Sequence, residues 1–223
     1  ESSTLVSPTA ASEEELTLWH TQEYVEAVRH LSEGDRQAEA RRYNLGPGDN
    51  PVFEGMYESE SLKAGATLQA ARVVVGGEVE VAFSFAGGLH HAMASYASGF
   101  CVFNDVAVAI RWLAEQGKRV LYVDVDAHHG NGVQAAFYST DQVMTISLHE
   151  SGHYLFPGTG FANEIGEGNG RGYSVNVPLL PYTDDAAYLT AFDGVVLPLA
   201  EEFDPDVLVT QLGVDTHYQD PLT

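Results

Sequence analysis

Two aspartates and a histidine alternate along one short stretch of the chain. Asp124, Asp126 and His128 follow an apolar run at 120–123, which reads Val-Leu-Tyr-Val. On an extended strand, alternate side chains point to the same face, so these three should project together. Carboxylates are rarely buried unless they are paired or coordinate a metal, and oxygen and nitrogen ligands of this kind suit zinc, iron or manganese. The spacing therefore predicts a metal site.

Polar groups also follow three other apolar segments. They are His90-His91 after 79–85, His149-Glu150 after 143–148, and Asp215 after 207–212. Ligands of open α/β sheets bind outside the carboxyl ends of the strands. We therefore expect the four groups to converge on a single active site.

Strand-like and helix-like segments alternate along the chain, which predicts an α/β fold with a parallel sheet and helices on both faces. The expected strands are 79–85, 119–125, 143–148, 173–177 and 207–212, and the expected helices are 12–28, 61–75, 104–115 and 183–203. Ser12 with Glu15 resembles a capping box, and Asn104 and Thr183 are expected to cap later helices. Pro198 is expected to kink or divide the last helix.

Composition excludes several classes of protein. A chain of 223 residues with 44% hydrophobic side chains suits one substantial domain. The single cysteine, Cys101, fits a reducing compartment, and no signal peptide or membrane-spanning run is present in the sequence. We therefore expect a cytoplasmic protein without a membrane partner. The formal charge of −22 argues against direct nucleic-acid binding, which needs a basic surface.

Several motifs occur in a fixed order from about Leu16 to Thr223. They are Gly87-Gly88-Leu89-His90-His91, Ser98-Gly99-Phe100-Cys101, Asn104-Asp105, the run from Asp124 to Gly132, Phe156-Pro157-Gly158-Thr159-Gly160, and Asp215. Together they resemble the zinc-dependent histone deacetylase family, and within it the acetoin-utilisation-type deacetylases of bacteria and archaea. The resemblance implies the three-layer arginase/deacetylase fold, with an eight-stranded parallel sheet. Residues 1–223 would form a single, incomplete catalytic domain.

The resemblance makes Asp126, His128 and Asp215 the ligands of one Zn²⁺ or Fe²⁺ per chain. Two carboxylates roughly neutralise such an ion, so its bound water is acidified less than at an all-histidine site. A separate general base is then useful, and the resemblance assigns that role to His91.

The same resemblance places His90 as an electrostatic partner beside Asp124. His91 would take a proton from water and later protonate the leaving amine. Asn131 stands where many relatives have an aspartate behind the second histidine. An amide orients an imidazole without adding charge, which favours a neutral, basic His91. Asn131 is equally well explained as a turn residue between two glycines.

Other roles are implied by resemblance alone. Phe100 and Phe156 would form the walls of a narrow tunnel, and Gly99 would accept a hydrogen bond from the substrate amide. Leu155 replaces an aromatic residue of many relatives, which suggests a wider tunnel, and Asp49 matches a rim acid that holds the substrate backbone. A buried K⁺ site would use Asp124, Ser147 and Leu148, and a peripheral monovalent site would use Phe137, Thr140, Val143 and Tyr173.

The predicted activity is hydrolysis of acetyl-lysine in proteins or of related small acetyl-amines. One alternative is an acetylpolyamine amidohydrolase. Another is an arginase-like ureohydrolase with two manganese ions, although Gly130 and His217 stand where the second metal would need acids. A third is a non-catalytic module that binds acyl groups. Metal analysis separates these readings, which require one metal ion, two or none.

The oxyanion of amide hydrolysis needs a donor besides the metal, and loss of one such donor typically costs about 10²–10³ in rate. Relatives supply a tyrosine from a Gly-Gly-Tyr loop, and this sequence contains no Gly-Gly-Tyr before it stops at Thr223. We therefore expect a fragment, truncated at both ends, that is poorly active by itself and has exposed apolar sheet edges. Full activity would instead point to Tyr218 as the donor.

Overall fold

The computed structural model of the chain describes residues 3–35 and 37–223. Its internal contacts divide it into two compact units, residues 1–112 and 113–223, which we call the N-terminal and C-terminal units. Each is described by itself. None of the described helices is both long enough and apolar enough to cross a bilayer.

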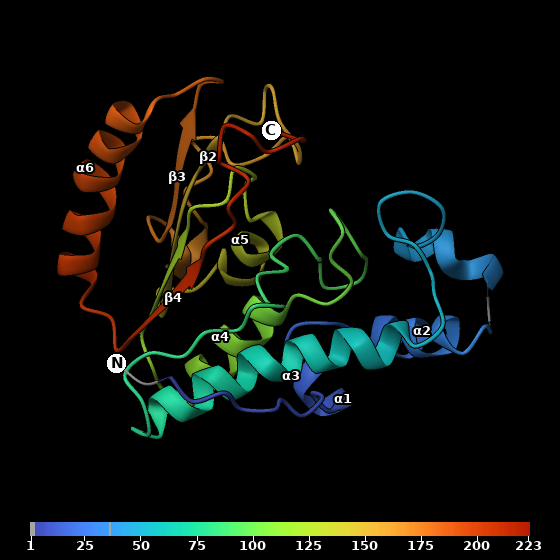
Figure 1. The fold of residues 1–223 in the computed structure, drawn as a ribbon. Helices are drawn as coiled ribbons and strands as arrows, with labels where there is room; N and C mark the ends of the chain where they lie inside the picture. The colour runs from blue at the N-terminus through green and yellow to red at the C-terminus, as the bar shows by residue number, and fades with distance from the viewer. Residues whose placement is uncertain (1–2, 36) are drawn as a thin grey trace. The chain divides into compact units, whose positions relative to one another are not determined.

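The N-terminal unit is mainly helical (Figure 1). Its elements are α1 (Glu13–Leu16), α2 (Gln22–Ser32), the 3-10 helix η1 (Gln37–Tyr43), the long α3 (Met56–Val75) and the first part of α4 (Asp105–Glu115). The capping box is confirmed, since the Glu15 N–H donates to Ser12 Oγ and the Ser12 N–H donates to the Glu15 carboxylate. The single helix expected over 12–28 is wrong. It breaks after Leu16, and Thr21 caps a separate α2 by accepting the Tyr24 N–H at 3.3 Å.

Aromatic side chains fill the core of the N-terminal unit. Tyr24 is fully buried, and its hydroxyl donates to the Val102 carbonyl at 2.8 Å. Its ring lies 5.9 Å from that of Phe103, edge to face, and 5.8 Å from that of Tyr43. Such pairs are stabilising beyond the area they bury. This core joins α2 to the segment that precedes α4.

The strand expected over 79–85 is wrong. Val81, Phe83 and Phe85 expose 83%, 60% and 92% of their surface, and no strand of the described chain pairs with this segment. Its alternating apolar residues have the pattern of a strand, but a strand also needs a neighbour for its backbone groups. Helix α3 also begins earlier than expected, at Met56 rather than Ser61.

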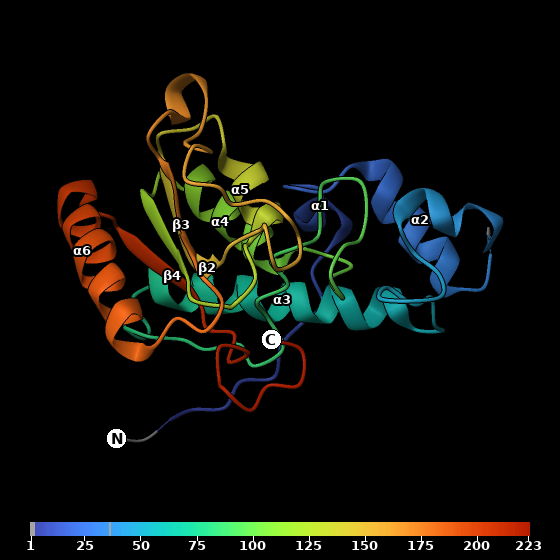
Figure 2. The ribbon, with the colours of Figure 1, turned by 90° about the horizontal axis from the view of Figure 1, so that it is seen from above.

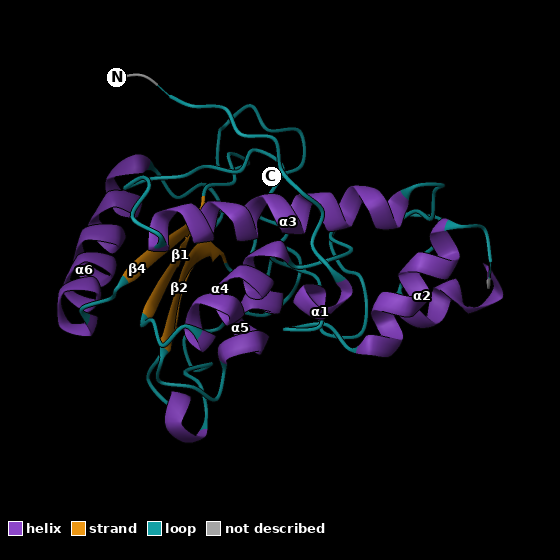
Figure 3. Ribbon diagram, turned by 90° about the horizontal axis from the view of Figure 1, so that it is seen from below, coloured by secondary structure: helices purple, strands orange, loops and turns teal. Residues whose placement is uncertain are grey.

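The C-terminal unit is built on a parallel sheet of four strands in the order β3-β2-β1-β4 (Figures 1 and 3). The strands are β1 (Val120–Asp124), β2 (Val143–Glu150), β3 (Ser174–Leu179) and β4 (Val207–Gln211). Four of the five expected strands are therefore confirmed, with ends shifted slightly. In the register Asp124 stands opposite Ser147 of β2 and Gln211 of β4. The carboxyl ends of the central strands thus lie at one edge.

Helices cover both faces of this sheet, α5 (Asn131–Phe137) on one and α6 (Asp185–Phe203) on the other (Figure 2). The side chains of α6 that pack on the sheet recur at helical spacing and are Tyr188, Ala191, Phe192, Val195, Val196, Leu199, Ala200 and Phe203. Asp184 caps α6 in place of Thr183, whose hydroxyl donates to Leu180 instead. The helix runs through Pro198, so the expected division is wrong. A proline removes one helical hydrogen bond, and the packed face stabilises the rest.

Candidate functional site

The candidate metal ligands come from the carboxyl ends of two paired strands. Asp126 and His128 follow β1, and Asp215 follows β4, its parallel neighbour. The His128 Nδ1 atom lies 2.7 Å from Asp215 Oδ2 and 3.2 Å from Asp126 Oδ1. One ligand atom from each of the three side chains lies within 4.8 Å of the others. We call these three residues the ligand triad.

The electrostatics of the ligand triad favour a cation. Burial alone lowers the pKa of His128, but the hydrogen bonds and charges of Asp126 and Asp215 outweigh it and raise the pKa to about 9. Two carboxylates therefore stabilise positive charge at this point. Because carboxylate oxygen and imidazole nitrogen are zinc and iron ligands, the same donor set fits a divalent metal ion.

Gln211, which sequence analysis did not single out, holds one ligand in place. Its side-chain amide donates to Asp126 Oδ2 at 2.9 Å, and its amide oxygen accepts the Gly213 N–H at 2.6 Å. A Cβ atom at Gly213 would collide with the Asp126 carboxylate. The close approach of the backbone after β4 to this ligand therefore requires glycine. The only sequence signal was a polar residue at the end of an apolar strand.

Asp124, which was expected to project together with Asp126 and His128, is fully buried and does not belong to the cluster of potential ligand atoms that Asp126, His128 and Asp215 form. Its carboxylate accepts the Tyr122 hydroxyl at 2.6 Å and the Asp126 N–H at 3.2 Å. Ser147 stands opposite it on β2, and the Ser147 hydroxyl lies 2.8 Å from His149 Nδ1. A K⁺ site formed by Asp124, Ser147 and Leu148 stays a prediction. So does the peripheral site, whose residues lie around the end of α5 and the starts of β2 and β3: Phe137, Thr140, Val143 and Tyr173.

The two adjacent histidines lie in the N-terminal unit. His90 and His91 are both buried, and their Nε2 atoms are 3.0 Å apart, close enough to share one proton. The Asp105 carboxylate positions the residues just before them by accepting the Gly88 N–H at 3.0 Å and the Leu89 N–H at 2.8 Å. Burial raises the pKa of Asp105. This buried acid anchors the loop that carries the histidine pair.

A second anchor comes from the turn between α1 and α2. His20 is buried, with Nδ1 3.1 Å from the Met93 carbonyl and Nε2 accepting the Asn104 N–H at 2.9 Å. Nε2 accepts, so Nδ1 carries the proton and donates to Met93. Burial lowers the pKa of His20 to about 4. Trp19 Nε1–H donates to the Ala92 carbonyl at 3.4 Å. Sequence analysis gave His20 no role, because its partners lie far along the chain.

The predicted substrate-contacting residues are divided between the units. In the N-terminal unit, Phe100 is exposed at the end of the 90–99 loop, the Cys101 thiol donates to the Gly99 carbonyl at 3.2 Å, and Asp49 is exposed in a loop. In the C-terminal unit, Leu155 is half-buried, and the ring of Phe156 lies 6.3 Å from that of His128. Asn131 is the first residue of α5. Their roles stay predictions.

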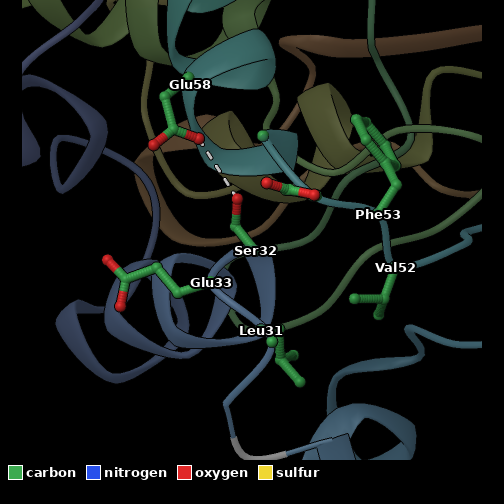
Figure 4. Close-up of a pocket in the computed structure, with 9 residues that line it drawn as sticks. Leu31, Ser32, Glu33, Val52, Phe53 and Glu58 are labelled. Carbon is green, nitrogen blue, oxygen red and sulfur yellow. Dashed lines mark hydrogen bonds between the residues drawn. The ribbon is translucent and has the colours of Figure 1, made fainter.

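Two further features of the N-terminal unit were not predicted. A cavity of about 480 Å³ lies between the end of α2 and the start of α3 and is lined by apolar side chains and three glutamates (Figure 4). Across it the Ser32 hydroxyl donates to Glu58 at 3.2 Å (Figure 4). Close by, His30, Glu33 and Asp35 bring three potential ligand atoms within 4.8 Å, although both acids are exposed. The cavity lining includes neither the ligand triad nor the histidine pair.

The chain matches known proteins along its whole length. The Histone deacetylase domain model matches residues 1–223. The chain is 49% identical to the acetoin utilization protein AcuC of Bacillus subtilis (strain 168) and 42% identical to AcuC of Staphylococcus xylosus, in each case over 98% of this chain and 57% of the relative. The crystal structure of an HDAC homolog from Aquifex aeolicus matches with a TM-score of 0.91 and 42% identity, over 97% of this chain and 59% of that one. An HDAC homolog complexed with SAHA matches equally well, with 43% identity.

Proposed function

Because the chain belongs to the histone deacetylase family, we propose that it takes part in the metal-dependent hydrolysis of acetyl-amines, with acetyl-lysine in proteins as the preferred substrate. The chain spans 57% of the length of the curated relatives it matches. The observation that carries the proposal is the convergence of Asp126, His128 and Asp215, which bring one ligand atom each within 4.8 Å. An expected metal ligand set in a chain of this family supports a catalytic role.

The ligand triad would hold one Zn²⁺ or Fe²⁺. The bound ion supplies a Lewis acid that polarises the amide carbonyl and acidifies water. Gln211 keeps Asp126 in position through its side-chain amide. The Ala127 N–H keeps Asp215 in position, because it donates to the Asp215 carboxylate at 2.9 Å. These bonds orient the ligands before any ion binds, and such indirect partners typically change metal affinity or activity by about 10–100-fold.

His91 would move the proton. Hydrolysis converts an amide and water into acetic acid and a free amine, so one proton must leave the water and one must reach the amine nitrogen. His91 takes the first as general base and delivers it as general acid. His90 lies with its Nε2 3.0 Å from that of His91 and would stay an electrostatic partner. Burial of both rings limits proton exchange with bulk water.

Substrate binding would involve Phe100, Phe156 and Leu155 as tunnel walls, Gly99 as hydrogen-bond acceptor and Asp49 at the rim. The position of Phe156 beside His128 supports its part in this set. Gly130 and His217 stand where the second metal ion of an arginase-like site would need acids, so the residues fit a site with one metal ion. An acetylpolyamine therefore stays the second candidate, and the arginase-like reaction is the less supported one.

Metal reconstitution combined with a substrate screen tests the proposal. Chelated protein is titrated with Zn²⁺ or Fe²⁺, and acetyl-lysine peptides, acetylpolyamines and small acetyl-amides are then compared. We expect one equivalent of metal to bind and to be required both for deacetylation and for binding of SAHA. Two equivalents of metal, or full deacetylation by exhaustively stripped protein, would contradict the proposal. Faster turnover of acetylpolyamines than of acetyl-lysine peptides would make acetylpolyamines the preferred substrate class.

A further inference from the structure

A closed set of hydrogen bonds, centred on Glu164, holds the glycine-rich segment 157–172 of the C-terminal unit. The Glu164 carboxylate accepts the Gly160 and Phe161 N–H groups, both at 3.1 Å. It also accepts the side-chain amide N–H of Gln134 at 2.7 Å. Gln134 belongs to α5, so Glu164 ties the segment to a helix distant in sequence.

His129 links Gln134 back to the glycine-rich segment. This ring is buried, with Nε2 3.1 Å from the Gln134 amide oxygen and Nδ1 2.8 Å from Thr159 Oγ1. An amide oxygen only accepts, so Nε2 must donate, which leaves Nδ1 to accept from the Thr159 hydroxyl. Each donor is thus matched to an acceptor around the ring. Ser174 and Asn176 of β3 also donate to the Gln134 oxygen, at 3.0 and 2.6 Å.

Gly160 is the residue of the segment that this set of hydrogen bonds holds in place. Its N–H donates to Glu164, and its carbonyl lies 2.9 Å from His149 Nε2. Its φ is +83°, and a Cβ atom there would collide with the rings of both His129 and His149. Only glycine fits against these two rings. The peptide on either side of Gly160 is therefore fixed in position.

Phe156 lies between the fixed Gly160 and a turn that begins at Ser151. On its N-terminal side, the Leu155 N–H donates to the Ser151 carbonyl at 3.2 Å, and after it the Gly158 N–H donates to the Leu155 carbonyl at 3.2 Å. The Phe156 side chain is partly exposed, and its ring faces that of His128 edge to face. The Glu164 set adds to these turn bonds, because it holds the backbone N–H groups of Gly160 and Phe161, four and five residues after Phe156.

We propose that Glu164 and Gln134 are positioning residues that fix Phe156 beside His128 and thereby determine how the acylated side chain fits. The effect on the fit of the acylated side chain rests on the proposed function, whereas the effect on the position of Phe156 does not. An acid and an amide are both needed, because Gln134 must accept from His129 and donate to Glu164. Exchanging the two residues keeps that complementarity, and changing either alone destroys it.

The test uses Glu164→Gln, Gln134→Glu and the double exchange. Protein labelled with fluorophenylalanine is examined by ¹⁹F NMR, and Phe156→Leu identifies the Phe156 signal. We expect each single change to shift and broaden this signal and the double exchange to restore it. The control is Glu167→Gln in the same segment, because the side chain of Glu167 is exposed and accepts a hydroxyl hydrogen bond from Ser139, at 3.1 Å. An unchanged signal in both single variants, or no recovery in the double, overturns the positioning role.

Kinetics test the fit of the substrate. For an acetyl-lysine peptide, we expect each single change to raise KM by about tenfold with kcat within about threefold, and the double exchange to reverse this. Metal affinity should stay at the wild-type value, because no ligand is altered. A fall in kcat at unchanged KM would overturn the role in substrate fit. Failure of the unmodified protein to bind one equivalent of metal refutes the proposed function, and the ¹⁹F result then still decides the positioning role.

Discussion

The ligand triad of the C-terminal unit and the histidine pair of the N-terminal unit are held in place by different means. Asp126, His128 and Asp215 follow paired strands, so the register of β1 and β4 places their backbones. His90 and His91 lie in an irregular segment without a strand or helix of its own. Side chains from distant parts of the unit, above all Asp105 and His20, hold that segment.

Because of this difference, we expect the two regions to respond differently to the substitution of a side chain. A sheet ladder distributes its stabilisation over many backbone bonds, so one altered side chain at its end changes the site without moving the strand. A loop held by a few buried side chains depends on each of them, and a buried donor left without its partner costs about 1–3 kcal/mol. We expect changes in the ligand triad to affect chemistry more than the fold, and changes at the loop anchors to affect the fold.

The largest effect is expected from Asp126→Ala. Removal of a direct ligand should lower metal affinity by more than the about 10–100-fold typical of an indirect partner, and activity should be lost with it. Circular dichroism should show the sheet intact, because β1 keeps its ladder. Calorimetric metal titration measures the affinity, and Asp141→Asn, an exposed acid just before β2, is the control. Unfolding of the variant would show that register alone does not hold this region.

The next effect is expected from His91→Ala. Loss of a general base typically lowers turnover by about 10²–10⁴-fold, and we expect a loss of at least about 10²–10³. Metal content should stay at one equivalent, since the ligand triad is untouched. Steady-state deacetylation and metal analysis of the same sample provide the measurement. If His90→Ala proves far more damaging than His91→Ala, the roles of the two histidines are reversed.

The smallest effect concerns His20 and depends on pH. Burial lowers the pKa of His20 in the folded protein to about 4, below the ordinary histidine pKa of 6.5, so the unfolded chain binds a proton more readily between these values. The contribution of neutral His20 is therefore fully present above pH 6.5 and is lost as pH falls towards 4. The shift corresponds to about 3 kcal/mol, at 1.36 kcal/mol per pKa unit.

Urea unfolding of wild type and His20→Gln between pH 4 and pH 7 measures this contribution. We expect the difference in free energy of unfolding to be greatest near pH 7 and to shrink by about 3 kcal/mol at pH 4. Trp19→Phe removes a neighbouring anchor of the same loop without a titrating group, so its difference should not change with pH. A constant difference for His20→Gln would show that the loop does not depend on the neutral ring.

Local signals in the sequence predicted most of the C-terminal unit. Apolar runs located β1 to β4, and the alternation after β1 indicated that Asp126 and His128 would lie together. The motifs predicted the family, which the comparisons confirm. Pro198 does not divide α6, because packing on the sheet outweighs one missing hydrogen bond.

Interactions between distant residues could not be predicted in the same way. Residues 79–85 alternate as a strand does, but pairing depends on a neighbour that the pattern does not reveal. His20 meets Asn104, and Gln134 meets Glu164, only once the chain has folded. A glycine such as Gly160 gave a local hint of close packing but no indication of which rings it packs against.

Strand β4 lies at one edge of the sheet and exposes Leu208, with Leu212 exposed just beyond it. An edge strand can pair with a strand of another molecule. The formal charge of −22 opposes such an encounter, because like-charged molecules repel each other at low ionic strength. Salt shortens the range of that repulsion to about 3 Å at 1 M. The colloidal behaviour of the protein is thus tied to ionic strength, and a concentrated sample stays dispersed best in dilute buffer.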